Sequence, residues 1–220
     1  MNPAVTQVLI SSYNKIKPQI KRRLADFRDL RKGEEEDIFQ ELCFCLFTPQ
    51  SKATSCDSAV RALKRKGLLI KGREGAIKKC LKGLVRFHNK KAEYLVGARK
   101  LFTLSHAKGG SAIDIKGKLD IFDSFKTREW LVDNVKGLGY KEASHFLRNI
   151  GLGKGLAILD VHILKNLKRY GVLKKIPASL TKKTYLEIEE KMRRFSKKIG
   201  IPLEELDLLL WASETGFIFK

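Results

Sequence analysis

The 220-residue sequence predicts an all-α protein. Apolar residues recur at helical spacing along most of the chain; Ala143, Phe146, Leu147 and Ile150, for example, fall at i, i+3, i+4 and i+7. No long stretch alternates polar and apolar residues as a half-buried strand would. Hydrophobic residues make up 43% of the chain, which favours a folded core over disorder. The length suits one large domain or two small lobes.

The first half of the chain predicts four helices. Ile38, Leu42, Cys45 and Leu46 mark the first, and the acidic run 34–37 before them favours the positive end of its dipole. The segment Thr48-Pro49-Gln50-Ser51 ends that helix and begins a second, which runs towards Gly67. Further helical patterns lie around residues 74–83 and 90–104, and the glycines in 108–111 predict a loop after them.

The second half predicts five more helices. Two lie around 127–135 and 140–150, and the glycine-rich stretch 151–155 forms the connection to the next. Ile163, Leu164 and Leu167 mark that third helix. Residues from Tyr185 to Ile199 form one long apolar face, with Thr181 or Thr184 as the N-cap. Pro202 opens the last helix, which carries Leu203, Leu206, Leu209, Leu210 and Trp211.

The charge balance predicts a polyanionic partner. Lysine and arginine number 45 against 24 acidic residues, a net charge of +21. Nucleic acid is the leading interpretation, and a generic basic surface or a membrane-surface protein are the alternatives. No apolar run is long enough to span a bilayer, and the N-terminus lacks the pattern of a signal peptide. We therefore expect a cytoplasmic, prokaryotic protein, and the high lysine and glutamate content suits a thermophile or an archaeon.

The four cysteines do not predict a metal site. Cys43, Cys45, Cys56 and Cys80 lack zinc-ribbon spacing, and no histidine accompanies them at ligand spacing. We expect buried or incidental thiols in a reducing compartment.

The segment from Val135 to Ala143 predicts a tight helical hairpin. Gly137 and Gly139 lie between two apolar helical patterns, and glycine accepts positive φ and close backbone approach. The second helix then begins with unbonded N–H groups and a positive dipole end, which suit a phosphate.

Lys141 is the candidate nucleophile. It lies two residues after Gly139, in the first turn of the second hairpin helix. An ordinary lysine, with a pKa of about 10.4, is only about 0.04% neutral at pH 7, and attack requires the neutral amine. A helix N-terminus and a cationic protein both favour the neutral form. A solvated surface charge is the alternative interpretation of this residue.

Asp160 predicts an N-cap for the helix that follows it, because aspartate accepts hydrogen bonds from first-turn N–H groups. The same carboxylate, facing a cleft, would stabilise a developing cation. His162 has apolar neighbours on both sides, so we expect a packed, hydrogen-bonded core histidine rather than a base.

The segment Gly137-Leu138-Gly139-Tyr140-Lys141, followed 19 positions later by Asp160-Val161-His162, resembles the helix-hairpin-helix DNA glycosylase superfamily. The C-terminal stretch from Leu209 to Lys220 resembles one branch of it, the archaeal-type 8-oxoguanine glycosylases (the second Ogg family). No cysteine follows Cys80, so the iron–sulfur loop of endonuclease III is absent from this chain. The resemblance covers residues from about 35 to 220.

The resemblance implies a bifunctional enzyme that excises 8-oxoguanine from double-stranded DNA and cleaves the abasic site through a lysine Schiff base. Lys141 and Asp160 would be catalytic, and the hairpin glycines would grip a phosphate. Gln50 would be the wedge that fills the gap left by the extruded base. Base recognition would fall to Trp211 and Lys220, with Phe87 as the opposing ring.

The resemblance also implies two helical lobes with the active site in the cleft between them: residues 32–152 in one, and 1–31 with 153–220 in the other. It implies no cofactor and no metal in the chemistry. A monovalent cation would sit among the carbonyls of Asp133, Val135 and Leu138. We expect a monomer that binds DNA with an oxidised purine and does not bind membranes.

Two alternatives stay open at this point. An endonuclease III-like glycosylase for oxidised pyrimidines would share the hairpin and Lys141. A non-catalytic helix-hairpin-helix module would bind DNA in a salt-dependent way without cleaving it. The sequence does not fix the lesion range or the preferred opposite base.

Overall fold

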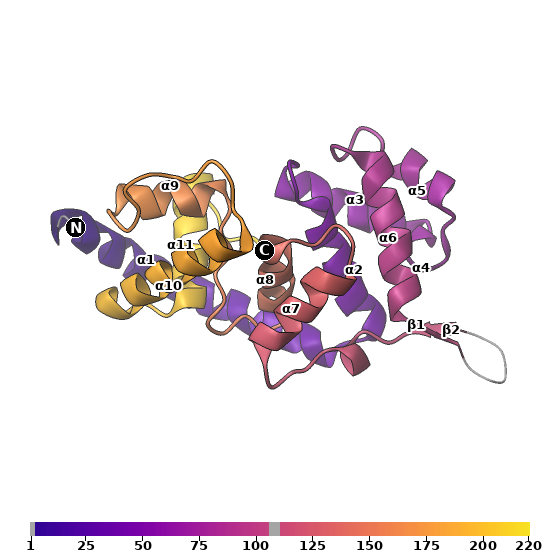
Figure 1. The fold of residues 1–220 in the computed structure, drawn as a ribbon, viewed down its shortest axis with the longest axis horizontal. Coiled ribbons are helices and arrows are strands. Elements are labelled where there is room, and N and C mark those ends of the chain that lie inside the picture. The colour runs from indigo at the N-terminus through magenta and orange to yellow at the C-terminus, as the bar shows by residue number, and fades with distance from the viewer. Residues whose placement is uncertain (1–2, 106–110) are drawn as a thin grey trace. The chain divides into compact units, whose positions relative to one another are not determined.

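The computed structural model describes residues 3–105 and 111–220, and this part of the chain is almost entirely helical (Figure 1). The described residues form eleven α-helices, which confirms the all-α prediction. In the described part, β1 (Thr103–Ser105) and β2 (Ser111–Ile113) form a short antiparallel pair that was not predicted. None of the described helices is long and apolar enough to cross a membrane.

The β1–β2 pair corrects the predicted ends of two segments. The helix expected over 90–104 ends at Phe102, because Thr103 takes extended backbone angles and its hydroxyl donates to the carbonyl of Arg99 at 2.7 Å. Of the loop expected over 108–111, residues 108–110 lie outside the described residues, and Ser111 belongs to β2.

The chain packs into two units, residues 30–146 and residues 1–29 with 147–220. The functional lobes expected from the sequence, with boundaries near 32 and 152, stay a prediction.

Helix α2 (Glu35–Phe47) is the central element of the unit formed by residues 30–146. Every residue from Glu41 to Phe47 is buried, together with Ile38 and Phe39, so other elements cover the helix on all sides. Helices α3 and α6 pack directly on it. The unit comprises, besides α2, α3 (Ala53–Arg65), α4 (Leu68–Lys71), α5 (Glu74–Leu81), α6 (His88–Phe102), the 3₁₀ turn η1 (Lys116–Lys118), α7 (Ser124–Asn134) and the start of α8 (Tyr140–Asn149).

The cysteines behave as expected. Cys43, Cys45 and Cys56 are buried, Cys80 is half-buried, and all four are free thiols. Cys43, Cys45 and Cys56 pack in the core as small apolar groups.

Helix α1 (Pro3–Lys32) is the element that the sequence analysis missed. Its buried side chains keep helical spacing, which is the signal that indicates it: Leu9, Tyr13, Ile20, Leu24 and Phe27. Pro18 lies inside this pattern and argues against a helix, because proline lacks an N–H. Both Pro18 and Asn14, whose carbonyl loses its partner, are exposed, so water can bond the carbonyl.

The unit formed by residues 1–29 and 147–220 contains, besides most of α1, the helices α9 (Val161–Arg169), α10 (Lys182–Ile199) and α11 (Leu203–Thr215). Thr181 is the N-cap of α10, as predicted, and its side chain accepts the N–H of Thr184. Pro202 precedes α11, which packs against both α9 and α10. The hydroxyl of Tyr13 donates to Glu205 Oε2 at 2.6 Å and so joins α1 to α11.

Candidate active site

The predicted hairpin joins α7 to α8. The N–H of Leu138 donates to the carbonyl of Val135 at 3.0 Å, and Gly137 has φ of +96°. A Cβ at Gly137 would lie 2.4 Å from the ring of Tyr94, so both the backbone and its neighbour require glycine. The amides of Gly137 and Gly139 donate to no group among the described residues. They are therefore available to a phosphate oxygen beside the N-terminus of α8.

Carbonyl oxygens of the same hairpin fit a hard cation. Those of Asp133 and Leu138 accept no backbone N–H among the residues with defined positions, and the carbonyl of Val135 uses one of its two lone pairs. Oxygen donors of this kind suit hard cations. The described residues contain no group of three or more His, Cys, Asp or Glu side chains able to hold a metal ion.

Lys141 lies in the first turn of α8, and two neighbours hold its amine. Its Nζ donates to Thr48 Oγ1 at 3.0 Å and lies 3.4 Å from Glu142 Oε1, with the side chain 21% exposed. Thr48 Oγ1 in turn donates to the carbonyl of Cys45 at 2.9 Å, so its own proton is engaged. The amine is thus oriented and largely shielded, yet keeps access to solvent.

Gln50 lies in the turn that follows α2, which we call the Thr48–Ser51 turn. The N–H of Ser51 closes it by donating to the carbonyl of Thr48 at 3.0 Å. Gln50 has φ of +54°, a left-handed conformation unusual for a residue other than glycine, and its side chain is exposed.

Lys91, which the sequence analysis did not single out, is buried beneath this turn. Its Nζ donates to the carbonyls of Phe47 at 2.7 Å and Pro49 at 2.9 Å, and to Ser51 Oγ at 2.9 Å. Burial, the largest cause, and the positive charge of Lys141 together lower the pKa of Lys91 to about 8. The signal in the sequence is a lysine at an apolar helical position, ahead of Leu95 and Ala98.

Phe87 lies next to the same turn. It precedes α6 with φ of +56°, its side chain is exposed, and the guanidinium of Arg86 lies 5.7 Å from its ring centre. The N–H of Arg86 donates to Ser51 Oγ at 3.0 Å. Hydrogen bonds therefore connect Lys141, the turn of Gln50 and the segment of Phe87 within one unit.

Asp160 is the N-cap of α9, as predicted. Its Oδ1 accepts the N–H groups of His162 at 2.9 Å and Ile163 at 2.8 Å. Its Oδ2 makes no hydrogen bond with any described residue, so half of the carboxylate stays available.

His162 departs from its prediction. It is half-buried rather than part of the core, and its buried Nδ1 has no hydrogen-bond partner among the described residues. The reason is its place in the first turn of α9, beside exposed Val161, rather than on the buried face that carries Ile163 and Leu164.

Trp211, near the end of α11, packs against the C-terminal segment 217–220. Its ring meets Phe217 edge-on at 5.4 Å between centres, and Phe219 lies nearly parallel to it at 6.3 Å. Phe219 thus covers one face of the indole, and Lys220 follows it, half-buried. Asp160, Trp211 and Lys220 belong to the unit with α9 and α11, whereas Lys141, Gln50 and Phe87 belong to the other.

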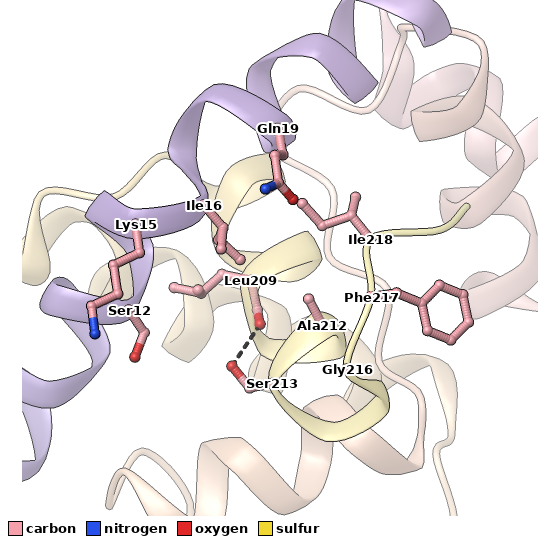
Figure 2. Close-up of a pocket in the computed structure, with 10 residues that line it drawn as sticks. All are labelled: Ser12, Lys15, Ile16, Gln19, Leu209, Ala212, Ser213, Gly216, Phe217 and Ile218. Atoms are coloured by element: carbon pink, nitrogen blue, oxygen red, sulfur yellow. Dashed lines mark hydrogen bonds between the residues drawn. The ribbon is translucent and has the colours of Figure 1, made fainter.

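A pocket of about 310 Å³ lies next to Phe217 (Figure 2). Side chains of α1, α11 and the C-terminal segment line it, among them Ser12, Gln19, Ser213 and Ile218. Phe217 points away from it in Figure 2. None of the predicted catalytic or base-recognition residues lines this pocket, and we therefore do not assign the chemistry to it.

In an all-α chain, the hairpin between α7 and α8 places this protein among the helix-hairpin-helix proteins. A family model described as 8-oxoguanine DNA glycosylase matches residues 20–201. The chain belongs to that family. An 8-oxoguanine DNA glycosylase/AP lyase of Fusobacterium nucleatum subsp. nucleatum is 44% identical over 213 residues, and the match covers 94% of each chain. The enzyme of that name from Methanocaldococcus jannaschii is 38% identical over 214 residues, again 94% of each.

Solved structures agree with these matches. The crystal structure of the Thermotoga maritima 8-oxoguanine DNA glycosylase aligns with a TM-score of 0.83 at 35% identity, over 99% of both chains. The Methanocaldococcus jannaschii 8-oxoguanine glycosylase/lyase, in complex with a 15mer DNA containing 8-oxoguanine, aligns with a TM-score of 0.84 at 35% identity. That match covers 99% of this chain and 100% of the other.

Proposed function

We propose that this protein is a DNA repair enzyme that excises 8-oxoguanine and cleaves the resulting abasic site. The observation that carries the proposal is the Lys141 amine, held by Thr48 at the N-terminus of α8 beside the unbonded hairpin amides. The names of the relatives support this chemistry over an oxidised-pyrimidine glycosylase and over a non-catalytic DNA-binding module.

In the proposed reaction, the neutral Nζ of Lys141 attacks C1′ of the damaged nucleotide. The bond from C1′ to the base breaks, and the base leaves with the electron pair and takes up a proton. The C1′–O4′ bond then breaks as a proton moves from the nitrogen to the ring oxygen, which leaves an open sugar with a protonated Schiff base between Nζ and C1′. Removal of a proton from C2′ then expels the 3′ phosphate, which cuts the strand.

Asp160 would stabilise the cationic transition state and assist the proton transfers. Its uncommitted Oδ2 supports this role. The Oδ1 atom stays engaged with the backbone of α9, so the carboxylate would be held in one orientation.

The remaining predicted site residues would bind the DNA. The amides of Gly137 and Gly139 would hold a phosphate, and a monovalent cation on the hairpin carbonyls would add positive charge there. Extruding the nucleotide costs a few kcal/mol of unstacking, and Gln50 would fill the gap in the duplex.

The extruded base would be recognised by aromatic stacking. Trp211 would stack on it through the indole face that Phe219 leaves open, and Lys220 would contact its edge. Phe87, whose side chain is exposed, would supply a second stacking ring. For the cellular location, the bacterial and archaeal relatives support the cytoplasm, where the chromosome of such cells lies.

Borohydride trapping tests the proposal. Wild-type protein, mixed with a duplex containing 8-oxoguanine opposite cytosine and reduced during turnover, should form a covalent adduct, because borohydride reduces the Schiff base. Lys141→Gln should form none while still binding the duplex. Lys100→Met, which removes one exposed lysine of α6, is the matched control and should trap like wild type. A wild-type protein that traps on no damaged duplex would exclude the lyase reaction.

A further inference from the structure

Lys91 is a buried ammonium that the proposed chemistry does not use. It is only 3% exposed, and it has no salt bridge with any described carboxylate. The titratable groups around it are the thiol of Cys56, Lys141, Glu142 and Arg86. Burying a charge without a counter-charge is costly even when its three N–H donors are hydrogen-bonded, so the residue is poorly explained by stability alone.

The ammonium donates all three of its hydrogen bonds to one short segment, residues 47–51. They go to the carbonyls of Phe47 and Pro49 and to the hydroxyl of Ser51, on both sides of Gln50. Ser51 Oγ also accepts the N–H of Arg86, which anchors the far side of the turn to the next loop. The ammonium therefore connects the whole segment to α6.

Gln50 itself depends on this support. Its left-handed backbone costs free energy, and its side chain makes no hydrogen bond with any residue the structure describes. Its direction is therefore set by the backbone of the turn. Thr48, by contrast, has its own bond to the carbonyl of Cys45, so the partner of Lys141 keeps an anchor that does not involve Lys91.

We propose that Lys91 is a positioning residue that holds the Thr48–Ser51 turn so that Gln50 is presented to the duplex. The proposal rests on the function proposed above, because the wedge has a role only in an enzyme that extrudes a base. Two residues of one small cluster would then have different roles: Lys91 supports the opening of the duplex, and Thr48 supports the nucleophile.

The test compares excision of 8-oxoguanine from duplex and from single-stranded oligonucleotides under single-turnover conditions. Lys91→Met should slow excision from the duplex at least tenfold. Excision from the single strand should change less than threefold, because no gap has to be filled and Lys141 keeps its partner. A variant that is merely less well folded would lose both activities alike. Lys100→Met should keep both rates.

A double-mutant cycle with Gln50→Ala sharpens the result. If Lys91 acts through Gln50, the double variant should be no slower on the duplex than the slower single variant. Losses that multiply, or an equal fall on both substrates, would overturn the proposal. Should Lys91→Met fail to fold, Ser51→Ala provides the test, because it removes one of the three acceptors of the Lys91 ammonium. Its excision rate on the duplex should fall by a smaller factor, with the single-strand rate less affected. Unchanged duplex excision by Ser51→Ala would then count against the proposal.

The proposed function and this inference fail in different ways. Absence of a trapped adduct in wild type would remove the function, and the comparison of Lys91 variants would lose its basis. A normal adduct in wild type together with unchanged duplex excision in Lys91→Met would remove only the role of Lys91.

Discussion

Asp160 combines a capping role that the structure shows with a catalytic role that we propose. Asparagine caps helices about as well as aspartate, so Asp160→Asn should keep α9 and the thermal stability while losing the charge. We expect excision to slow by about 10² to 10⁴, the usual contribution of acid–base catalysis, with DNA affinity unweakened. Single-turnover excision, a binding titration and a thermal melt check this. Undiminished turnover would remove Asp160 from the mechanism.

The site residues differ in how well the sequence indicates them. Lys141 and Asp160 belong to local patterns, a glycine hairpin and a helix start, and both local structures are confirmed. Thr48 has no such pattern and Lys91 has only its place on an apolar helical face, because their partners lie 93 and about 40 residues away in the chain. Only the packing of α2, α6 and α8 brings them together, and the local spacing of residues does not predict such packing.

The contact between α1 and α11 predicts a pH effect on stability. Burial raises the pKa of Tyr13 above its ordinary value of 10, and the hydrogen bond to Glu205 raises it further. Because its pKa is higher in the folded state than in the unfolded state, Tyr13 contributes stability that is fully present below pH 10. This contribution is lost as the pH rises towards the folded pKa.

Tyr13→Phe should therefore cost about 2 kcal/mol at neutral pH, where the hydrogen bond to a charged group is intact. The difference in unfolding free energy between wild type and variant should shrink above pH 10. Lys91 titrates in the same range but is present in both proteins, so its effect cancels in the difference. Urea unfolding at several values between pH 7 and pH 11 measures it. A difference that stays constant with pH would contradict the assignment.

Most helices follow from the sequence because their apolar spacing and caps are local. Thr181, Asp160 and Pro202 mark helix starts that the structure confirms or closely matches. Helix α1 was missed because Pro18 contradicts the pattern of its buried face, and only an exposed position makes that proline tolerable. The β1–β2 pair is three residues per strand, too short for alternation to be recognised.

At the scale of the whole molecule, the positive charge should determine the overall affinity for DNA, whereas contacts to the extruded base should determine the preference for the lesion. A net charge of +21 attracts any DNA, because phosphates are the same in damaged and undamaged duplexes. Stacking on Trp211 and contacts to the base edge would depend on the extruded nucleotide. Overall affinity and preference for the lesion can therefore be separated by changing the salt concentration.

The inactive Lys141→Gln protein allows this separation to be measured without cleavage of the DNA. Each neutralised phosphate contributes a slope of about −0.9 to a plot of log affinity against log salt, so even two contacts give about a twelvefold loss between 50 and 200 mM. We expect at least this loss for both damaged and undamaged duplexes in fluorescence anisotropy titrations. The ratio of the two affinities should change far less, since stacking is not driven by counterion release. Affinity that does not change with salt would show that the excess charge does not contact the DNA backbone. If the ratio of the affinities for damaged and undamaged duplex instead falls steeply with salt, lesion recognition rests on charged contacts rather than on the aromatic residues.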